Sequence, residues 1–179
     1  MKRSASAVAL VMLASMTAAA ATLTSETLAA WDDHIAAVEA RIDRELASRQ
    51  RAVPRALEGR TIHVPGGMIQ QWRGAIFLPH AALDALLAQL QEPPEHGPHQ
   101  EDVAALRIIR RRPDGLDLYI RMTRRKLVSV TYDTEHRVTF RRHSPERASS
   151  RSVATRITEV GTGGDRGFLW RLNAYWRYE

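Results

Sequence analysis

The stretch Phe168-Leu-Trp-Arg-Leu-Asn-Ala-Tyr-Trp-Arg-Tyr178 decides the fold class of this chain. Every second residue from Phe168 to Tyr178 is apolar or aromatic, whereas the residues between them include two arginines and an asparagine. Alternation with a period of two is typical of a β-strand that has one buried face and one wetter face. The sequence therefore predicts a strand over 168–178, paired with the segments that precede it.

The preceding segments show the same alternation and are separated by residues that favour turns. Strands are predicted over 103–111, 116–123, 128–132, 137–143 and 148–160. The turns between them are expected at 112–115, at the basic kink 124–126, and at 133–136, 144–147 and 161–165. Strands joined by short turns between neighbours form an antiparallel meander.

The N-terminus has the layout of a secretory signal peptide. Met1-Lys2-Arg3 is positively charged, residues 5–16 are apolar and uncharged, and small residues occupy 18–21. The apolar run is short for a membrane span, and an uncleaved anchor or a buried helix is the alternative. We therefore expect residues 1–21 to be removed from a periplasmic or secreted protein. The absence of cysteine excludes thiolate metal ligands and cysteine nucleophiles.

Residues 22–58 are predicted to form an amphipathic helix and a connector. Thr24 or Ser25 can cap the first free amides. Apolar residues then recur every three or four positions: Leu28, Trp31, Ile35, Val38, Ile42 and Leu46. We expect this stripe to pack on its own domain, with a partner helix as the alternative. The remaining residues, 59–179, are expected to form one sheet domain, with a turn at Pro65-Gly66, a strand over 68–78 and a short helix over 82–90.

Four motifs resemble one family of proteins. They are Val64-Pro-Gly-Gly67 with Trp72-Arg-Gly74, Asp133-Thr-Glu-His136, Arg147-Ala-Ser-Ser-Arg-Ser-Val-Ala-Thr-Arg-Ile157, and Gly167-Phe-Leu-Trp-Arg-Leu-Asn-Ala-Tyr-Trp-Arg-Tyr178. Together they are similar to exported bacterial proteins that resemble the START and polyketide-cyclase-like (SRPBCC) superfamily. That family has no assigned reaction, so the resemblance implies no catalytic residue.

The resemblance implies an α+β fold in which a curved antiparallel sheet wraps a long C-terminal helix, the helix-grip fold. Family members continue past the last strand with another strand and that helix, whereas this sequence ends at Glu179. The resemblance thus implies a sheet that is incomplete at the C-terminus and a face without its principal cover. We expect the N-terminal helix to substitute for that cover, or two chains to self-associate through the open face.

Other motifs favour structural explanations over chemistry. Arginine clusters at 110–112, 124–126 and 141–142 lie at strand ends, so we expect a solvated face or protected sheet edges, and no nucleic acid. His96 and His99 with Glu101 supply too few ligands for a catalytic zinc site, so we expect no metal and no cofactor. Ser149, Ser150 and Ser152 have no base at a recognisable spacing and are expected to form a row of hydroxyls across the sheet.

The apolar face of the predicted sheet is the candidate binding surface, because helix-grip proteins use that face to line a cavity. Its expected ligand-binding residues are Trp72, Ile120, Tyr132, Phe140, Arg142, Arg151, Trp170 and Trp176. The expected ligand is an apolar or amphipathic, lipid-like small molecule bound without catalysis, with peripheral membrane contact as a further expectation. A cyclase- or hydrolase-like enzyme that uses the same cavity is the alternative, as is a truncated chain without function.

Overall fold

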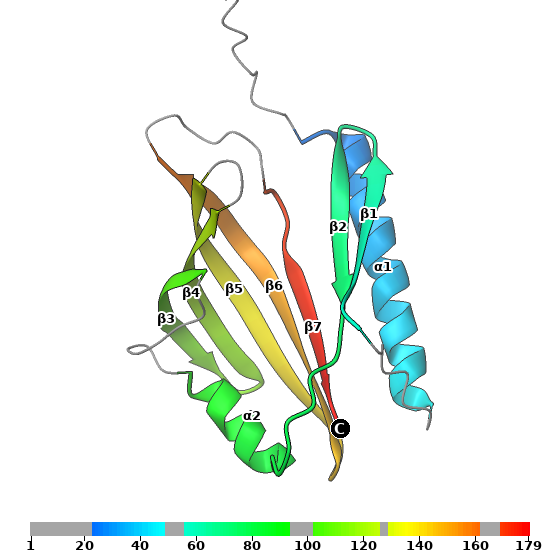
Figure 1. Cartoon of the computed structure of the whole chain (residues 1–179), viewed down its shortest axis with the longest axis vertical. Coiled ribbons are helices and arrows are strands. Elements are labelled where there is room, and N and C mark those ends of the chain that lie inside the picture. The colour runs from blue at the N-terminus through cyan, green and yellow to red at the C-terminus, as the bar shows by residue number, and fades with distance from the viewer. Residues whose placement is uncertain (1–22, 49–55, 94–101, 126–128, 162–168) are drawn as a thin grey trace, which may run out of the picture.

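The computed structural model describes residues 23–48, 56–93, 102–125, 129–161 and 169–179. These residues form an α+β structure with two helices, a five-stranded antiparallel sheet and a separate two-stranded sheet (Figure 1). The α+β class and the antiparallel sheet are as the sequence predicts.

The five-stranded sheet is an open meander. Its strands are β3 (Val103–Arg112), β4 (Gly115–Arg125), β5 (Ser129–Ser144), β6 (Arg147–Val160) and β7 (Asn173–Tyr178). They lie in the order β3-β4-β5-β6-β7, so each strand pairs with its neighbours in the chain and the predicted meander is confirmed. The sheet does not close, because β3 and β7 stay at its two edges.

Two sequence predictions about these strands are wrong. The predicted turn at 133–136 lies inside β5, which runs without a break from Ser129 to Ser144. Thr134 is fully buried and His136 is 5% exposed. These polar residues have the composition of a turn, but they make their hydrogen bonds inside the sheet. The last strand is also shorter than expected, because it begins at Asn173. Most of the predicted hairpin at 161–165 lies outside the described residues.

The N-terminal part contains α1 and the two-stranded sheet. Helix α1 (Ser25–Ala47) is capped by Thr24, whose hydroxyl accepts from the amide of Thr27 at 3.2 Å. Strands β1 (Glu58–Val64) and β2 (Gly67–Arg73) form a hairpin beside α1 (Figure 1). The hairpin reverses at Gly66, whose φ of 71° suits glycine. The hydroxyl of Thr27 ties this turn to α1 by donating to the carbonyl of Pro65 at 2.6 Å.

Helix α2 (Leu83–Gln91) lies against one end of the five-stranded sheet (Figure 1). The guanidinium of Arg142 on β5 lies 2.5 Å from the carboxylate of Asp84. At the helix C-terminus, Arg111 of β3 makes two hydrogen bonds to the carboxylate of Glu92, at 2.6 and 2.7 Å. The short helix predicted at 82–90 is confirmed.

The two faces of the five-stranded sheet differ in chemistry. The inner face contains the even-numbered residues of β4, β5 and β7 and their partners on β6, including Leu116, Ile120, Tyr132, Thr134, His136, Val138, Phe140, Ser150, Ser152 and Trp176. The outer face contains the alternate residues, including Asp117, Tyr119, Arg121, Asp133, Arg137, Thr139, Arg151, Tyr175 and Arg177. Arg142 on the inner face contacts α2, whereas Arg151 on the outer face contacts Glu39 of α1.

Candidate binding surface on the inner face of the sheet

The inner face combines apolar side chains with buried polar ones, and its β7 end is exposed. Leu116 and Leu118 of β4 are 3% and 8% exposed, and they form the buried part of the face. Phe140 and Ile120 are only half-buried. Trp176 of β7 is 53% exposed, although its register places it on the same face. An apolar face that leaves a tryptophan half in solvent has surface available for another molecule.

Small side chains separate the aromatic residues of this face. In register, Ser150 of β6 lies between Phe140 of β5 and Trp176 of β7. One step along, Ser152 lies between Val138 and Ala174. Larger side chains on β5 therefore face β7 across a line of small residues on β6.

A polar cluster lies at the centre of the inner face. The Nδ1 atom of His136 is 3.1 Å from the hydroxyl of Ser152, and its Nε2 atom is 3.0 Å from the hydroxyl of Thr134. Thr134 donates its hydroxyl hydrogen to the carbonyl of Ile120 at 3.0 Å. It must then accept from Nε2, so the proton of the neutral ring sits on Nε2 and Nδ1 accepts from Ser152.

Burial lowers the pKa of His136 below its ordinary value, because the charged imidazolium loses its solvation. The ring is therefore neutral at physiological pH. The centre of the inner face thus offers polar atoms without a net charge, which is compatible with a largely apolar ligand.

A charged side chain lies at the α2 end of the inner face. Arg142 pairs with Asp84, whose side chain is 83% exposed, and donates to the carbonyl of Pro145 at 2.8 Å. Since the Arg142 side chain is 39% exposed, an acidic head group could replace the exposed carboxylate of Asp84 as its partner.

Five of the predicted site residues share the inner face, spread along the length of the sheet: Ile120, Tyr132, Phe140, Arg142 and Trp176. The other three do not. Trp72 lies on β2 of the separate hairpin, where it pairs with Gly59 and is 62% exposed. Trp170 lies before β7 begins, against Gly67 of the same hairpin.

The prediction that Arg151 shares the face of Tyr132 is wrong. Arg151 pairs with Thr139, and both point to the outer face because neighbours along a strand alternate between faces. Its guanidinium lies 2.8 Å from the carboxylate of Glu39 on α1. Val153 pairs with Arg137 on the outer face for the same reason.

Sequence reasoning missed the central cluster of Thr134, His136 and Ser152. Asp133 to His136 resembles a turn by composition, and Ser152 resembles a member of a hydroxyl row. One signal in the sequence could have found the cluster. If the alternation of Tyr132, Val138 and Phe140 is continued without a break, Thr134 and His136 fall on the same face as these residues.

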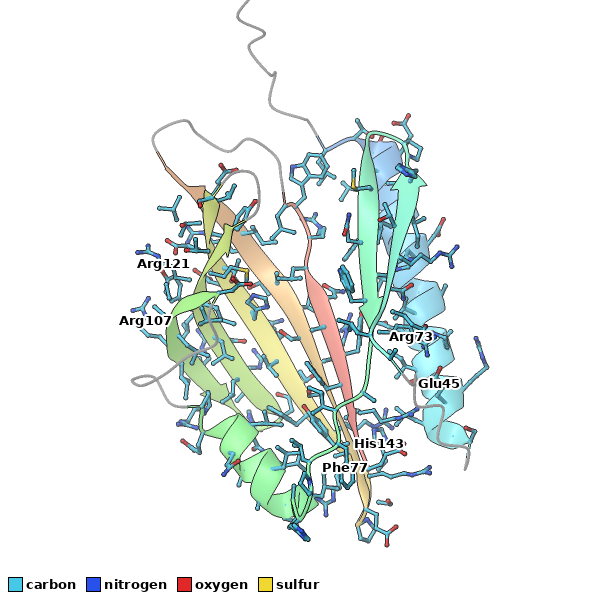
Figure 2. The ribbon with its side chains drawn as sticks, in the orientation of Figure 1. Glu45, Arg73, Phe77, Arg107, Arg121 and His143 are labelled. Carbon is cyan, nitrogen blue, oxygen red and sulfur yellow. The ribbon has the colours of Figure 1, made fainter. Side chains whose placement is uncertain are left out.

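Arginines on the outer face are mostly paired with carboxylates. Arg121 makes two hydrogen bonds to Asp133, at 2.7 and 2.8 Å, and Arg137 lies 3.5 Å from Asp117. Figure 2 shows Arg121 and Arg107 projecting from the β3–β4 side of the sheet, where Arg107 stacks on the ring of Tyr119 at 4.6 Å. Such pairing supports the interpretation of a solvated, charged face.

Large apolar side chains are also exposed around the hairpin. Leu57 and Trp72 are 72% and 62% exposed, and in the linker to α2 Ile76 and Phe77 are 74% and 87% exposed. Phe77 is labelled in Figure 2. Leu57 lies against Gly74, where an added Cβ would sit 3.0 Å from its side chain. These residues are apolar surface that the two sheets do not bury.

Several predictions fall outside the part of the chain that the structure describes, namely the signal peptide at 1–21 and the histidine pair at 96–99 with Glu101. Within the described ranges, no group of three or more histidine or acidic side chains is arranged to hold a metal ion. No helix among the described residues is both long and apolar enough to cross a membrane.

Comparisons with protein-family models, curated proteins and solved structures find no match for the chain.

Proposed function

We propose that this protein binds an apolar or amphipathic small molecule, such as a lipid, on the inner face of its five-stranded sheet, without catalysing a reaction. One observation carries the proposal: Trp176 stays 53% exposed on the inner face, beside the buried Ser150 and on the same face as the half-buried Phe140. A ligand that lies over Ser150 and Ser152 would contact Phe140 on one side and Trp176 on the other.

The energetics favour an apolar ligand body. Burying a large side chain such as tryptophan against a ligand contributes on the order of 1.5–3 kcal/mol. The neutral cluster around His136 adds orientation without a cost for burying charge. Arg142, at the α2 end, is the residue that would hold an acidic head group where the ligand has one.

The resemblance to the START and polyketide-cyclase-like superfamily supports the same proposal, as does the open antiparallel sheet. Helix-grip membership, export to the periplasm or medium, and self-association remain parts of this proposal. Peripheral membrane contact would use the exposed residues Leu57, Ile76 and Phe77. N-terminal sequencing of protein from the producing cell tests export, with a start between about Ala20 and Thr24 expected and an intact Met1 against it.

A hydrolase is the second candidate, and the contact between Ser152 and His136 favours it. The hydroxyl of Ser152 donates to Nδ1 of a neutral histidine, as the hydroxyl of an activated serine does. Both side chains, however, lie on strands whose backbone amides are engaged in the sheet ladder, and this leaves fewer donors for an oxyanion. We therefore expect no labelling of the protein by a fluorophosphonate probe. Labelling that Ser152→Ala abolishes would establish the hydrolase instead.

A neutral fluorescent dye, N-phenyl-1-naphthylamine, tests binding at the inner face. Wild-type protein should enhance its fluorescence saturably, and Trp176→Ala and Phe140→Ala should each weaken binding about tenfold, which corresponds to about 1.4 kcal/mol. Arg141→Ala is the matched control, because Arg141 is exposed on the outer face of β5, the strand that carries Phe140 on its inner face. Equal binding by all four proteins would contradict the proposal.

A further inference from the structure

The two-stranded hairpin has one face that packs on α1 and one face that does not. Ile69 of β2 is 6% exposed, and Arg73 lies 3.5 Å from the carboxylate of Glu45 on α1, so the odd-numbered residues of β2 face the helix. Neighbouring residues along a strand point to opposite faces. Met68 and Trp72 therefore point away from α1, and they are 58% and 62% exposed.

The side chain of Trp72 covers the neighbouring strand. Its ring lies over Gly59, its partner on β1, where an added Cβ would be 2.6 Å from the ring. Next to this pair, the side chain of Leu57 lies against Gly74, 3.0 Å from a Cβ added there. The apolar surface therefore extends across the width of the hairpin.

The linker from β2 to α2 continues this surface (Figure 1). It carries Ile76, Phe77 and Leu78, which are 74%, 87% and 49% exposed. We give the name hairpin patch to the exposed apolar residues of the hairpin and this linker, namely Leu57, Met68, Trp72, Ile76, Phe77 and Leu78. An exposed apolar surface of this kind marks contact with a membrane or with another protein.

The hairpin patch lies in a part of the chain that carries positive charge. No aspartate or glutamate occurs in the sequence between Glu58 and Asp84, whereas this stretch contains Arg60 and Arg73. Arg73 is paired with α1, but Arg60 is exposed on β1. The charge beside the patch therefore attracts an anionic surface.

Charge also decides between a membrane and a second copy of the chain. The chain has a formal net charge of +6, so a second copy would bring the same positive excess and be repelled. An anionic bilayer has the opposite charge and accepts projecting apolar side chains. The linker at 74–78 is neither helix nor strand. Its backbone should therefore stay in the headgroup region, where its polar groups remain solvated, and only its side chains should enter the acyl boundary.

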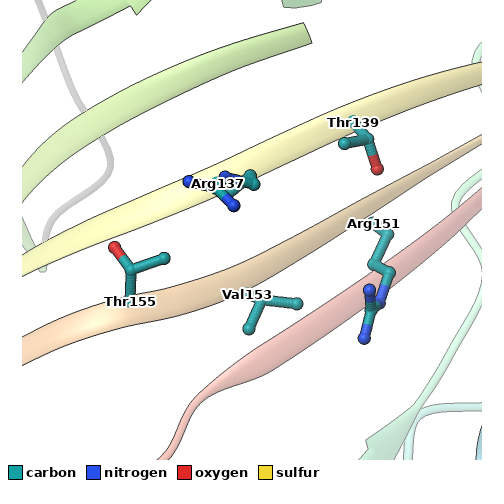
Figure 3. A pocket seen from close by; sticks show the side chains of 5 residues that line it. All are labelled: Arg137, Thr139, Arg151, Val153 and Thr155. Carbon is teal, nitrogen blue, oxygen red and sulfur yellow. The ribbon is translucent and has the colours of Figure 1, made fainter. Parts of the chain in front are cut away.

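The outer face of the five-stranded sheet is a poorer surface for this contact. A hollow of about 170 Å3 on it is lined by Arg137, Thr139, Arg151, Val153 and Thr155 (Figure 3). Arg137 lies 3.5 Å from Asp117, and Arg151 lies 2.8 Å from Glu39, so both arginines are already paired within the protein. Contact with a bilayer there would take these charges out of water, which is costly. The hairpin patch itself contains no charged side chain.

We propose that the hairpin patch docks the protein on an anionic phospholipid bilayer. Ile76 and Phe77, the most exposed side chains of the patch, enter the acyl boundary. Trp72 lies at the level of the headgroups, where tryptophan is enriched in membrane proteins. Arg60 contacts lipid phosphates. The proposal deepens the peripheral membrane contact named in the proposed function and rests on that part alone, because it uses no residue of the inner face.

Flotation with two kinds of vesicle tests the apolar and the charged parts of this contact. Vesicles of equal parts phosphatidylcholine and phosphatidylglycerol should bind the protein at least fivefold more tightly than vesicles of phosphatidylcholine alone. The double variant Ile76→Ser/Phe77→Ser should bind the mixed vesicles at least tenfold more weakly. Both side chains are exposed, so the variant should melt like the wild type. Arg60→Gln should weaken binding about fivefold, and only to the mixed vesicles.

A fluorescent label reports which surface meets the bilayer. The chain contains no cysteine, so one introduced cysteine takes a single nitrobenzoxadiazole label. A label at Phe77→Cys should gain fluorescence when mixed vesicles are added, because it moves from water into lipid. A label at Asp33→Cys should not, because Asp33 is exposed on α1 and the patch points away from that helix.

Ile109→Ser is the matched control for the double variant. Ile109 is also a large apolar residue, 50% exposed, but it lies on β3 at the edge of the sheet far from the hairpin, so its variant should bind vesicles like the wild type (Figure 1). Binding of N-phenyl-1-naphthylamine by the double variant should also match the wild type. A loss of vesicle binding with intact dye binding thus separates this surface from the inner face.

Three results would overturn the proposal. The first is equal vesicle binding by the double variant and the wild type, which would assign membrane contact to another part of the chain. The second is a label at Phe77→Cys whose fluorescence does not change on vesicles that bind the protein. The third is a wild-type dimer in sedimentation that binds no vesicles and that the double variant converts to a monomer, which would assign the hairpin patch to self-association.

Discussion

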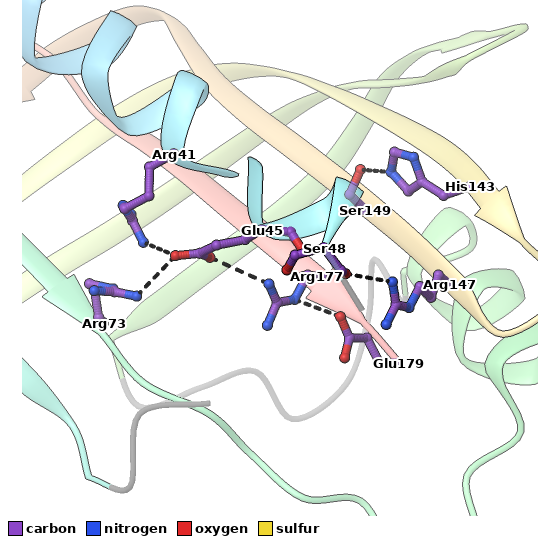
Figure 4. A network of polar contacts seen from close by, with 9 residues as sticks. All are labelled: Arg41, Glu45, Ser48, Arg73, His143, Arg147, Ser149, Arg177 and Glu179. Carbon is purple, nitrogen blue, oxygen red and sulfur yellow. Dashed lines mark hydrogen bonds and ion pairs between the residues drawn. The ribbon is translucent and has the colours of Figure 1, made fainter. Parts of the chain in front are cut away.

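Glu45 near the end of α1 and Arg177 on β7 form an ion pair of 3.4 Å although 132 residues separate them in the sequence. The same carboxylate accepts from Arg41 at 3.0 Å and lies 3.5 Å from Arg73 of β2 (Figure 4). Arg177 also lies 2.9 Å from the carboxylate of Glu179. One acidic side chain thus joins the helix, the hairpin and the edge strand of the larger sheet.

Glu45→Gln should therefore destabilise the protein. The side chain is 22% exposed and that of Arg177 is 17% exposed, so solvent compensates little for the lost pair. We expect the free energy of unfolding in urea to fall by about 2 kcal/mol, the magnitude of a hydrogen bond to a charged group. Asp33→Asn, at an exposed position of the same helix, should change it by less than about 0.5 kcal/mol. Equal effects would mean that Glu45 does not connect these elements.

Stability should depend on pH through His136. Burial lowers the pKa of its ring in the folded state, so the unfolded chain binds the proton more readily. Below the ordinary histidine pKa of about 6.5, the free energy of unfolding should then fall as the pH falls. Above about pH 7.5 this histidine should contribute no slope, because it is neutral in both states.

Urea unfolding between pH 5 and 8 measures this dependence, and His136→Gln should flatten it. His34 and His143 also have pKa values lowered by partial burial, so a smaller slope of the same sign should remain. An unchanged slope in the variant would assign the pH dependence to those two residues.

Gly115, at the start of β4, has no room for a side chain. A Cβ added there would lie 1.9 Å from the carbonyl oxygen of Val138, an atom of the β5 backbone. Gly115→Ala should therefore separate β4 from β5 and lower the free energy of unfolding by about 3 kcal/mol. Gly161→Ala is the matched control, because an added Cβ there meets no atom of the described residues within 4 Å. A thermal melt that is the same for both variants would contradict this prediction.

The sequence predicts most of the larger sheet, because its turns are marked locally. Pro113 to Gly115 and Ser144 to Arg147 supply proline, glycine and serine where the structure reverses. The central cluster could not be predicted in the same way. Asp133 to His136 has the composition of a turn, whereas its pairing with β4 and β6, including the bonds of Thr134 to Ile120 and of His136 to Ser152, makes it part of a strand.

The candidate site was predictable where strand alternation alone decides the face, as for Tyr132 and Phe140. Arg151 was assigned to the wrong face because the register of β6 against β5 depends on pairing, which composition does not encode. The sequence places Trp72 in the larger sheet, whereas it lies in the separate hairpin of β1 and β2. Alternation with a period of two is the same in either sheet, so it does not show that β2 pairs only with β1.

Methyl NMR with a spin-labelled ligand tests inner-face binding most directly. The methyl ester of a doxyl-labelled fatty acid is neutral, so the arginines of the outer face do not attract it. It should broaden the methyl signals of Ile120 and Val138 on the inner face more strongly than those of Val153 on the outer face. Broadening of Val153 with sharp Ile120 and Val138, or no broadening at saturating ligand, would contradict ligand binding by the inner face.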